Sequence, residues 1–141
     1  MASKKVYVDH LSQVDLFQNF SRKHLERVAA AGDHTELQAG KVLFRQDQSG
    51  SEAFIILSGE VTIERNGKNV ATLGAGQLIG ELSLLDQGPR TATATCATDC
   101  EVLVISRPRF IALIDDLPEL QRPLFASLAG RLRNLDRTAF G

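Results

Sequence analysis

The sequence predicts an α+β fold in which an antiparallel β-roll or jelly roll, a double-stranded β-helix, is flanked by helices at both ends of the chain. Two observations carry this prediction. Short β-type runs separated by glycine-containing turns fill the middle of the sequence, and apolar residues at helical spacing occur on either side. The chain of 141 residues fits one domain with a substantial core. We divide this domain into N-terminal helices over 1–34, a β-roll over 35–106 and C-terminal helices over 107–141.

One or two short helices are predicted between residues 15 and 31. Ser21 is placed to cap a helix N-terminus, and Leu25 and Val28 follow it at helical spacing. From Thr35 the apolar residues no longer follow helical spacing. β-type runs follow at 42–44, 54–57, 61–63, 70–73, 91–97 and 102–105. Asn66-Gly67 between two of these runs is a strong signal for a type I′ hairpin. Short strands at such spacing are typical of a sandwich, a jelly roll or a β-roll.

Helical spacing returns after the last predicted strand. Pro108 opens a short helix over 108–114, because proline is favoured in the first turn of a helix. A longer helix is predicted from about Pro118 to Arg137, and Pro123 kinks it or delays its start. The apolar stripe of this helix consists of Leu120, Leu124, Leu128, Leu132 and Leu135.

A carboxylate, a hydroxyl and a guanidinium lie within ten residues of one another in the middle of the chain. Glu81 and Ser83 precede a predicted tight turn at 86–88, and Arg90 follows it, so the chain folds back on itself. Arg90 offers a planar set of donors suited to phosphate. Gly80 permits close approach of the backbone, and a helix beginning there would direct free N–H groups at the same anion. Glu81 only accepts hydrogen bonds and therefore suits a sugar hydroxyl. We predict a site for a small ligand that carries both an anion and a hydroxyl.

Residues 80–94 read GELSLLDQGPRTATA, and within them 80–93 resemble the phosphate-binding cassette of the cyclic nucleotide-binding domain family. The resemblance covers almost the whole chain, since helices, a β-roll and helices follow in the same order. It implies that Arg90 binds the cyclic phosphate, that Ser83 donates to the same group and that Glu81 accepts from the ribose 2′-OH. Backbone N–H groups near Gly80, Leu82 and Ala92 would complete the phosphate site.

The resemblance leaves recognition of the base open. In the family a threonine in the position of Thr91 favours cGMP, but many cAMP-binding members carry threonine there too. The C-terminal helix commonly covers the base, and the corresponding lid positions are Leu132, Leu135 and Asp136. A leucine stripe that only packs on the β-roll or on a partner helix is an equal alternative. We expect cAMP, because the stand-alone layout is typical of bacterial members, with cGMP as the alternative.

The function implied by the resemblance is that of a sensor and not of an enzyme. Its C-terminal helix would move on ligand binding and signal through an unidentified protein effector or through a homodimer. The sequence stops at Gly141, where the family's transcription factors continue into a winged helix, so we expect a stand-alone receptor. Two alternatives are a non-binding interaction module with this fold and a metal-dependent cupin enzyme. His10, His24 and His34 have no metal-ligand spacing and no catalytic motif is visible, so we expect no metal.

The composition of the chain limits where in the cell we expect the protein and which classes of partner we expect it to bind. A net charge of -1 and a pI near 6.3 argue against a dedicated nucleic-acid surface. Neither a long apolar run nor a signal-peptide layout is present, so we expect no membrane insertion and a cytoplasmic location. Cys96 and Cys100 would lie on one face of a strand with poor geometry for a disulfide, and we expect buried thiols in a reducing compartment.

Overall fold

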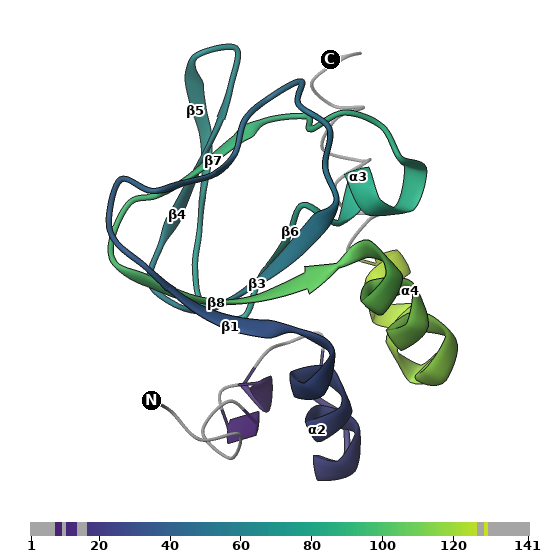
Figure 1. The fold of residues 1–141 in the computed structure, drawn as a ribbon. Helices are drawn as coiled ribbons and strands as arrows, with labels where there is room; N and C mark the ends of the chain where they lie inside the picture. Colours follow the sequence, from purple (N-terminus) through teal and green to yellow (C-terminus); the bar gives the residue numbers. More distant parts are fainter. Residues whose placement is uncertain (1–7, 10, 14–16, 127–128, 130–141) are drawn as a thin grey trace.

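A computed structural model of the chain describes residues 8–9, 11–13, 17–126 and 129. These residues form two four-stranded antiparallel sheets with helices on either side of them in the sequence. The predicted α+β fold, an antiparallel β-roll between helices, is confirmed. Figure 1 shows the helices over 22–31 and 107–116 on the side of the β-roll away from the hairpin over 61–73.

The first sheet has the order β1-β8-β3-β6 and the second the order β2-β7-β4-β5. The strands of the first sheet are β1 (Asp33–Leu37), β3 (Glu52–Ser58), β6 (Leu78–Ile79) and β8 (Cys100–Ser106). Those of the second are β2 (Val42–Phe44), β4 (Val61–Arg65), β5 (Lys68–Leu73) and β7 (Thr93–Cys96). The helices are α2 (Arg22–Ala31), α3 (Glu81–Asp86) and α4 (Arg107–Asp116), and residues 118–126 are also helical.

Strand β3 is buried on both faces, because the second sheet covers one face and helices cover the other. Phe54 and Ile56 belong to an apolar cluster that includes residues of β4 and β7. Ile55 and Leu57 alternate to the opposite face and belong to a cluster that includes Phe110 of α4. This position explains why residues 53–57 are all buried, without the polar alternation of a half-exposed strand.

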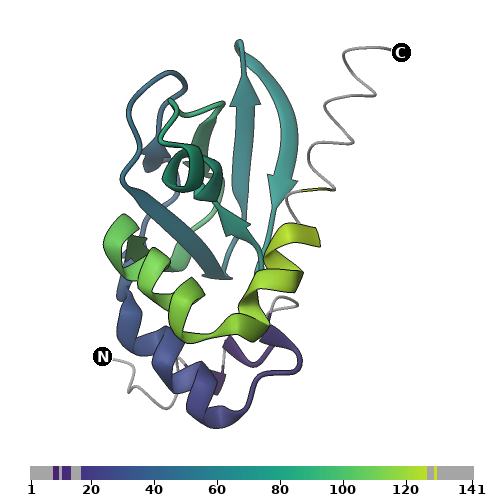
Figure 2. The same cartoon turned by 90° about the vertical axis from the view of Figure 1, so that its right-hand side faces the viewer.

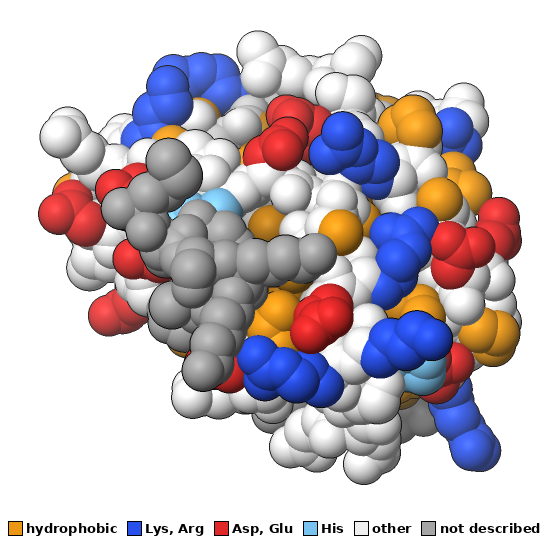
Figure 3. Space-filling view, turned by 60° about the horizontal axis from the view of Figure 1, so that its bottom comes forward, with side chains coloured by type: hydrophobic (Ala, Val, Ile, Leu, Met, Phe, Trp, Pro, Cys, Tyr) orange, Lys and Arg blue, Asp and Glu red, His pale blue; other side chains and the backbone are white. Residues whose placement is uncertain are grey.

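Helices α2 and α4 pack side by side beneath the first sheet, as Figures 1 and 2 show. Arg27 of α2 pairs with Asp116 at 2.7 Å, and His24 pairs with Glu119 of the following helix at 2.7 Å. Figure 3 shows this end of the molecule, where acidic and basic side chains are interspersed. Within the described residues, no helix is long and apolar enough to cross a membrane.

Two local predictions agree with the structure in detail. Ser21 caps α2, because its Oγ accepts a hydrogen bond from the backbone N–H of His24 at 3.2 Å. Asn66 and Gly67 both have positive φ, 54° and 80°, as a type I′ turn between β4 and β5 requires. In both cases the residues that determine the conformation lie within three positions of one another in the sequence.

Other boundaries differ from the prediction. Residues 17–20 form a turn and not an α-helix, so the described N-terminal part contains a full helix only from Arg22. Strands β1 and β6 were not predicted, because Asp33–Leu37 is mostly polar and Leu78–Ile79 is very short. The last helical stretch begins at Pro118, so Pro123 does not delay its start. Leu128, Leu132 and Leu135 of its predicted stripe lie outside the described residues.

Cys96 and Cys100 do not share one strand as predicted, because Cys96 ends β7 and Cys100 begins β8 in the other sheet. Both are free thiols that are 1% and 3% exposed, as expected for small apolar core residues. Both belong to the cluster between the two sheets. Burial, together with a hydrogen bond to Cys100, raises the pKa of Cys96 to about 11.

Both thiols should therefore react slowly with a thiol reagent in the native protein at about pH 8 and rapidly in denaturant. The thiolate is the reactive form, and at that pH Cys96 is almost entirely protonated because its pKa is about 11. A colorimetric thiol titration with and without guanidinium chloride measures the two rates. Equal rates in both conditions would contradict the buried positions of these residues.

Candidate ligand-binding site

Helix α3 and the segment after it form the centre of the candidate site. After β6, Gly80 turns the chain into α3 with a φ of 83°, a left-handed conformation that suits glycine. Gln87, with a φ of 58°, ends the helix, and the chain returns through Arg90 to β7. The predicted reversal therefore lies where we expected it, although Asp86 still belongs to the helix. Figure 1 shows α3 next to β6, the edge strand of the first sheet.

The guanidinium of Arg90 is buried, since the residue is only 4% exposed. Its Nη1 donates to the carbonyl oxygen of Gly80 at 2.9 Å, and its Nη2 donates to that of Glu52 at 2.7 Å. The ring of Phe44 lies 4.3 Å from the guanidinium carbon, in the geometry of a cation–π contact. The buried Nε has no hydrogen-bond partner within the described part of the chain. At least the Nε donor of the cation is thus left for a further acceptor.

The backbone of Arg90 is held as firmly as its side chain. Its N–H donates to the carbonyl of Gln48 at 2.8 Å, and its carbonyl accepts from the N–H of Asp47 at 2.8 Å. Asp47 has a φ of 69°, a conformation that aspartate adopts more readily than most residues. The turn between β2 and β3 therefore determines where the arginine enters the site.

Two acidic residues influence the charge of this arginine. Burial lowers the pKa of Arg90, and the carboxylates of Glu52 and Glu81 oppose that shift. Glu81 is fully buried at 0% exposure in the first turn of α3, and Ser83 is 4% exposed on the same helix. The neighbouring carboxyl groups thus offset part of the cost of burying the guanidinium.

Two glycines leave the space that the guanidinium occupies. A Cβ atom on Gly50 would overlap Arg90 and lie 2.9 Å from Nη2, and one on Gly80 would lie 2.6 Å from Nη1. Larger residues at either position would displace the arginine. The site therefore depends on small residues from two separate turns.

The structure brings together most of the predicted cassette residues. Gly80, Glu81 and Ser83 lie at the start of α3, and Arg90 contacts Gly80 directly. The other predicted residues are distributed as follows: Leu82 lies in α3, Ala92 is buried before β7, Thr91 is exposed, and Leu132, Leu135 and Asp136 lie outside the described residues.

Sequence reasoning missed the residues that support Arg90 from other strands. Phe44 contributes a ring, Glu52 a backbone carbonyl and Gly50 the absence of a side chain. The role of a backbone carbonyl cannot be inferred from the residue type, and the sequence around Phe44 is that of an ordinary core residue. Arg65 is a further case, because its Nε donates to the carbonyl of Thr91 at 3.1 Å from the end of β4.

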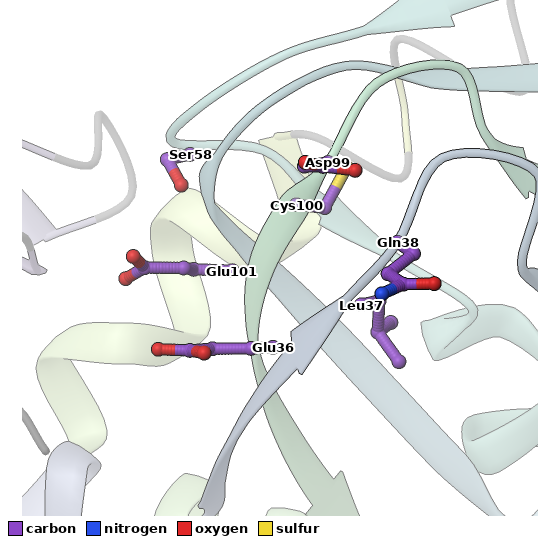
Figure 4. A pocket seen from close by; sticks show the side chains of 7 residues that line it. All are labelled: Glu36, Leu37, Gln38, Ser58, Asp99, Cys100 and Glu101. Atoms are coloured by element: carbon purple, nitrogen blue, oxygen red, sulfur yellow. The ribbon is translucent and has the colours of Figure 1, made fainter.

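A separate pocket of about 470 Å³ lies at the far ends of β3 and β8 (Figure 4). Seven residues line it: Glu36, Leu37, Gln38, Ser58, Asp99, Cys100 and Glu101. Glu52 near Arg90 and Ser58 in this pocket are at opposite ends of β3, roughly 20 Å apart along an extended strand. The carboxylates that line this pocket would repel an anionic ligand. Two of them already have partners: Glu101 pairs with His34 at 3.1 Å, and Asp99 accepts a hydrogen bond from the N–H of Ala39 at 2.9 Å.

No group of three or more His, Cys, Asp or Glu side chains in the described ranges is arranged to hold a metal ion. His34 is engaged by Glu101, and His24 lies against Glu119.

A sequence profile of the cyclic nucleotide-binding domain matches residues 34–116 of this chain. The cyclic AMP receptor protein of Thermus thermophilus is 40% identical over 102 residues, which make up 69% of this chain and 47% of that protein. The crystal structure of Thermus thermophilus catabolite activator protein has a TM-score of 0.81 at 34% identity and covers 88% of this chain and 61% of that chain.

A cAMP-bound structure of PfPKA-R has a TM-score of 0.86 and covers 98% of this chain and 48% of that chain. Its identity of 24% makes it evidence for the fold alone. The chain spans about half the length of the curated relatives it matches, 47% and 57% for the first two.

Replacing Gly50 by alanine should displace the Arg90 guanidinium and lower the free energy of unfolding by about 1–3 kcal/mol, the usual effect of overpacking. Gly74→Ala is the matched control, because a Cβ there meets no atom within 4 Å and Gly74 has no left-handed backbone. That variant should stay within about 0.5 kcal/mol of the parent protein. Urea unfolding measures both variants, and equal stability of the two would show that the guanidinium is not confined.

Proposed function

Since the chain belongs to the cyclic nucleotide-binding domain family, we propose that it is a sensor that binds a cyclic nucleotide, with cAMP as the preferred ligand. Binding moves the helices after the β-roll, and these helices pass the signal to a protein partner or to a second copy of the chain. The proposal includes no catalytic step and no metal ion. The buried free thiols Cys96 and Cys100 fit a reducing compartment such as the cytoplasm.

The observation that carries this proposal is the unused donor of Arg90. A buried cation is stabilised only by partners that face it, and the Nε of Arg90 has none within the described residues. A cyclic phosphate supplies a charged acceptor at this position, and hydrogen bonds between two charged groups are about twice as strong as neutral ones. Gly80, where α3 begins, allows the phosphate to approach the backbone closely.

The two buried polar side chains of α3 fit the remaining parts of the ligand. Ser83 is a hydroxyl donor two residues after the buried carboxylate of Glu81. A carboxylate accepts hydrogen bonds and does not donate them, so Glu81 suits the ribose 2′-OH and not the phosphate. Ser83 is left to donate to the phosphate.

The preference for cAMP rests on the relatives. The curated relative with 40% identity is named a cyclic AMP receptor protein, and its match includes 69% of this chain. The exposed position of Thr91 is compatible with either base, because its side chain is free to meet a ligand from outside the β-roll. The alternative, a cGMP-selective sensor, would bind the phosphate and the ribose in the same way and would differ from our proposal only in which base it prefers.

Helix α3 links the site to the helices that would carry the signal. Leu84 of α3 is fully buried in the same cluster as Phe110 and Leu113 of α4 and Leu120 and Leu124 of the next helix. Movement of α3 towards a bound phosphate changes the surface on which these helices rest. Ligand affinity and helix position are then coupled, and a ligand that prefers one arrangement shifts the population towards it.

Calorimetric titration with cAMP and with cGMP tests the proposed function. We expect saturable binding of cAMP at micromolar concentration or below and weaker binding of cGMP. Stronger binding of cGMP would identify a cGMP-selective sensor. Absence of binding of either nucleotide at tens of micromolar would overturn the proposal and favour an interaction module with the same fold.

Arg90→Lys should reduce cAMP affinity by roughly 30-fold or more, because lysine keeps the charge and loses the planar arrangement of donors that holds two carbonyls and the phosphate together. Arg45→Lys, which changes an exposed arginine at the end of β2, is the control and should bind as the parent protein does. The same titration measures both. Undiminished binding by Arg90→Lys would place the phosphate elsewhere.

Glu81→Gln should narrow the preference for cAMP over its 2′-deoxy analogue. If the Glu81 carboxylate accepts from the 2′-OH, the parent protein should favour cAMP by about 10- to 100-fold, the usual range for a hydrogen bond to a charged group. The ratio of the two dissociation constants is the measured quantity in both proteins. A ratio that Glu81→Gln leaves unchanged would assign the 2′-OH to another residue.

A further inference from the structure

We infer that Arg107 is a positioning residue that joins the cassette helix α3 directly to α4 and transmits movement between them. The Nε of Arg107 donates to the carbonyl oxygen of Leu84 at 3.0 Å, although 23 positions separate the two residues. Its backbone N–H donates to the carbonyl of Ser51 at 2.9 Å. The first residue of α4 is therefore bonded both to Ser51, directly before β3, and to α3. This inference rests on the proposed function of the cassette.

The acceptor in this contact is a carbonyl near the C-terminal end of α3. The last four carbonyls of an α-helix have no partner within the helix, and Leu84 is among the last four residues of α3. A basic side chain placed there satisfies the carbonyl and complements the negative end of the helix. Arg107 thus caps the C-terminal end of α3 from another helix.

The two ends of α3 are held by two different arginines. Arg90 donates to the carbonyl of Gly80, directly before the first residue of α3, and Arg107 donates to Leu84 near the end. A helix of six residues is short and stiff, so a displacement at its N-terminal end also moves its C-terminal end. An anion that engages Arg90 therefore acts on Arg107 through α3.

The hydrogen bond adds something that the apolar contacts do not supply. Leu84 also packs in the cluster with Phe110, but apolar packing is non-directional and permits the two helices to slide. A hydrogen bond weakens steeply when its distance or angle changes, so it fixes the register between the end of α3 and the start of α4. We therefore assign the transmission of small displacements to Arg107.

The chain offers a matched control in the same helical turn. Arg109 is also in the first turn of α4, but it is exposed and its Nη1 lies 3.8 Å from Asp33 at the start of β1. Arg107 and Arg109 have the same side chain and lie in the same turn of α4. They differ in that only Arg107 reaches α3.

The experiment compares Arg107→Met with Arg109→Met by amide hydrogen exchange, with and without cAMP. Without ligand, we expect exchange in α3 to be about threefold faster or more in Arg107→Met than in Arg109→Met, because one carbonyl of the helix loses its partner. With cAMP, Arg109→Met should gain protection in both α3 and α4. Arg107→Met should gain protection in α3 and lose most of the gain in α4.

The inference is overturned if the two variants show the same exchange in α3 without ligand, or the same gain in α4 with cAMP. Failure of the parent protein to bind cAMP or cGMP would overturn the proposed function, and the comparison without ligand would then still test the contact between Arg107 and α3. Arg107→Leu and Arg109→Leu repeat the comparison in case the methionine variant of Arg107 is unfolded. Leucine has no side-chain donor for the carbonyl of Leu84, so equal exchange in that pair would also overturn the inference.

Discussion

The arrangement of the candidate site depends on the burial of one cation, the guanidinium of Arg90. A charge that is 4% exposed is tolerated only where the protein surrounds it with acceptors. These come from separate segments: the carbonyls of Glu52 and Gly80 and the ring of Phe44. Because the ring of Phe44 lies 5.9 Å from that of Phe54, the cation is also connected to the core of the β-roll. Strands β2 and β3 and the turn before α3 are thereby held in a single relative position.

The short helix α3 lies between two parts of the molecule that are held by different kinds of interaction. On one side of α3 lies the segment that carries Arg90, with backbone hydrogen bonds of 2.8 Å to the segment 47–48. On the other side lie α4 and the helix after it, which pack through apolar side chains and are joined to α2 by exposed ion pairs such as Arg27 with Asp116. Apolar contacts and exposed ion pairs give way more easily than a buried hydrogen-bond network. Movement at the site is therefore expected to appear in the helices and not in the strands.

Much of the fold could be predicted from the sequence, because many of its elements are determined by neighbouring residues. Ser21 caps α2 through an amide three positions on, and Asn66-Gly67 sets the hairpin by its own backbone preferences. Strand β1 was missed for the opposite reason. Its polar sequence becomes a strand because β8 pairs with it, in the register Thr35 opposite Val102. Pairing of this kind is a property of the partner strand and is absent from local propensity.

For the candidate site, the sequence by itself determined the chemistry, through Glu81, Ser83 and Arg90 at a spacing that allows one turn between them. Only the tertiary structure decided what holds them. The partners of Arg90 and Arg107 are mainly backbone carbonyls, of Gly80, Glu52 and Leu84, and every residue type has such a carbonyl. The residue type shows which hydrogen-bond donors a side chain has. Which carbonyl accepts from them depends on how distant strands and helices pack. That packing makes a motif of three polar residues into a site joined to the helices around it.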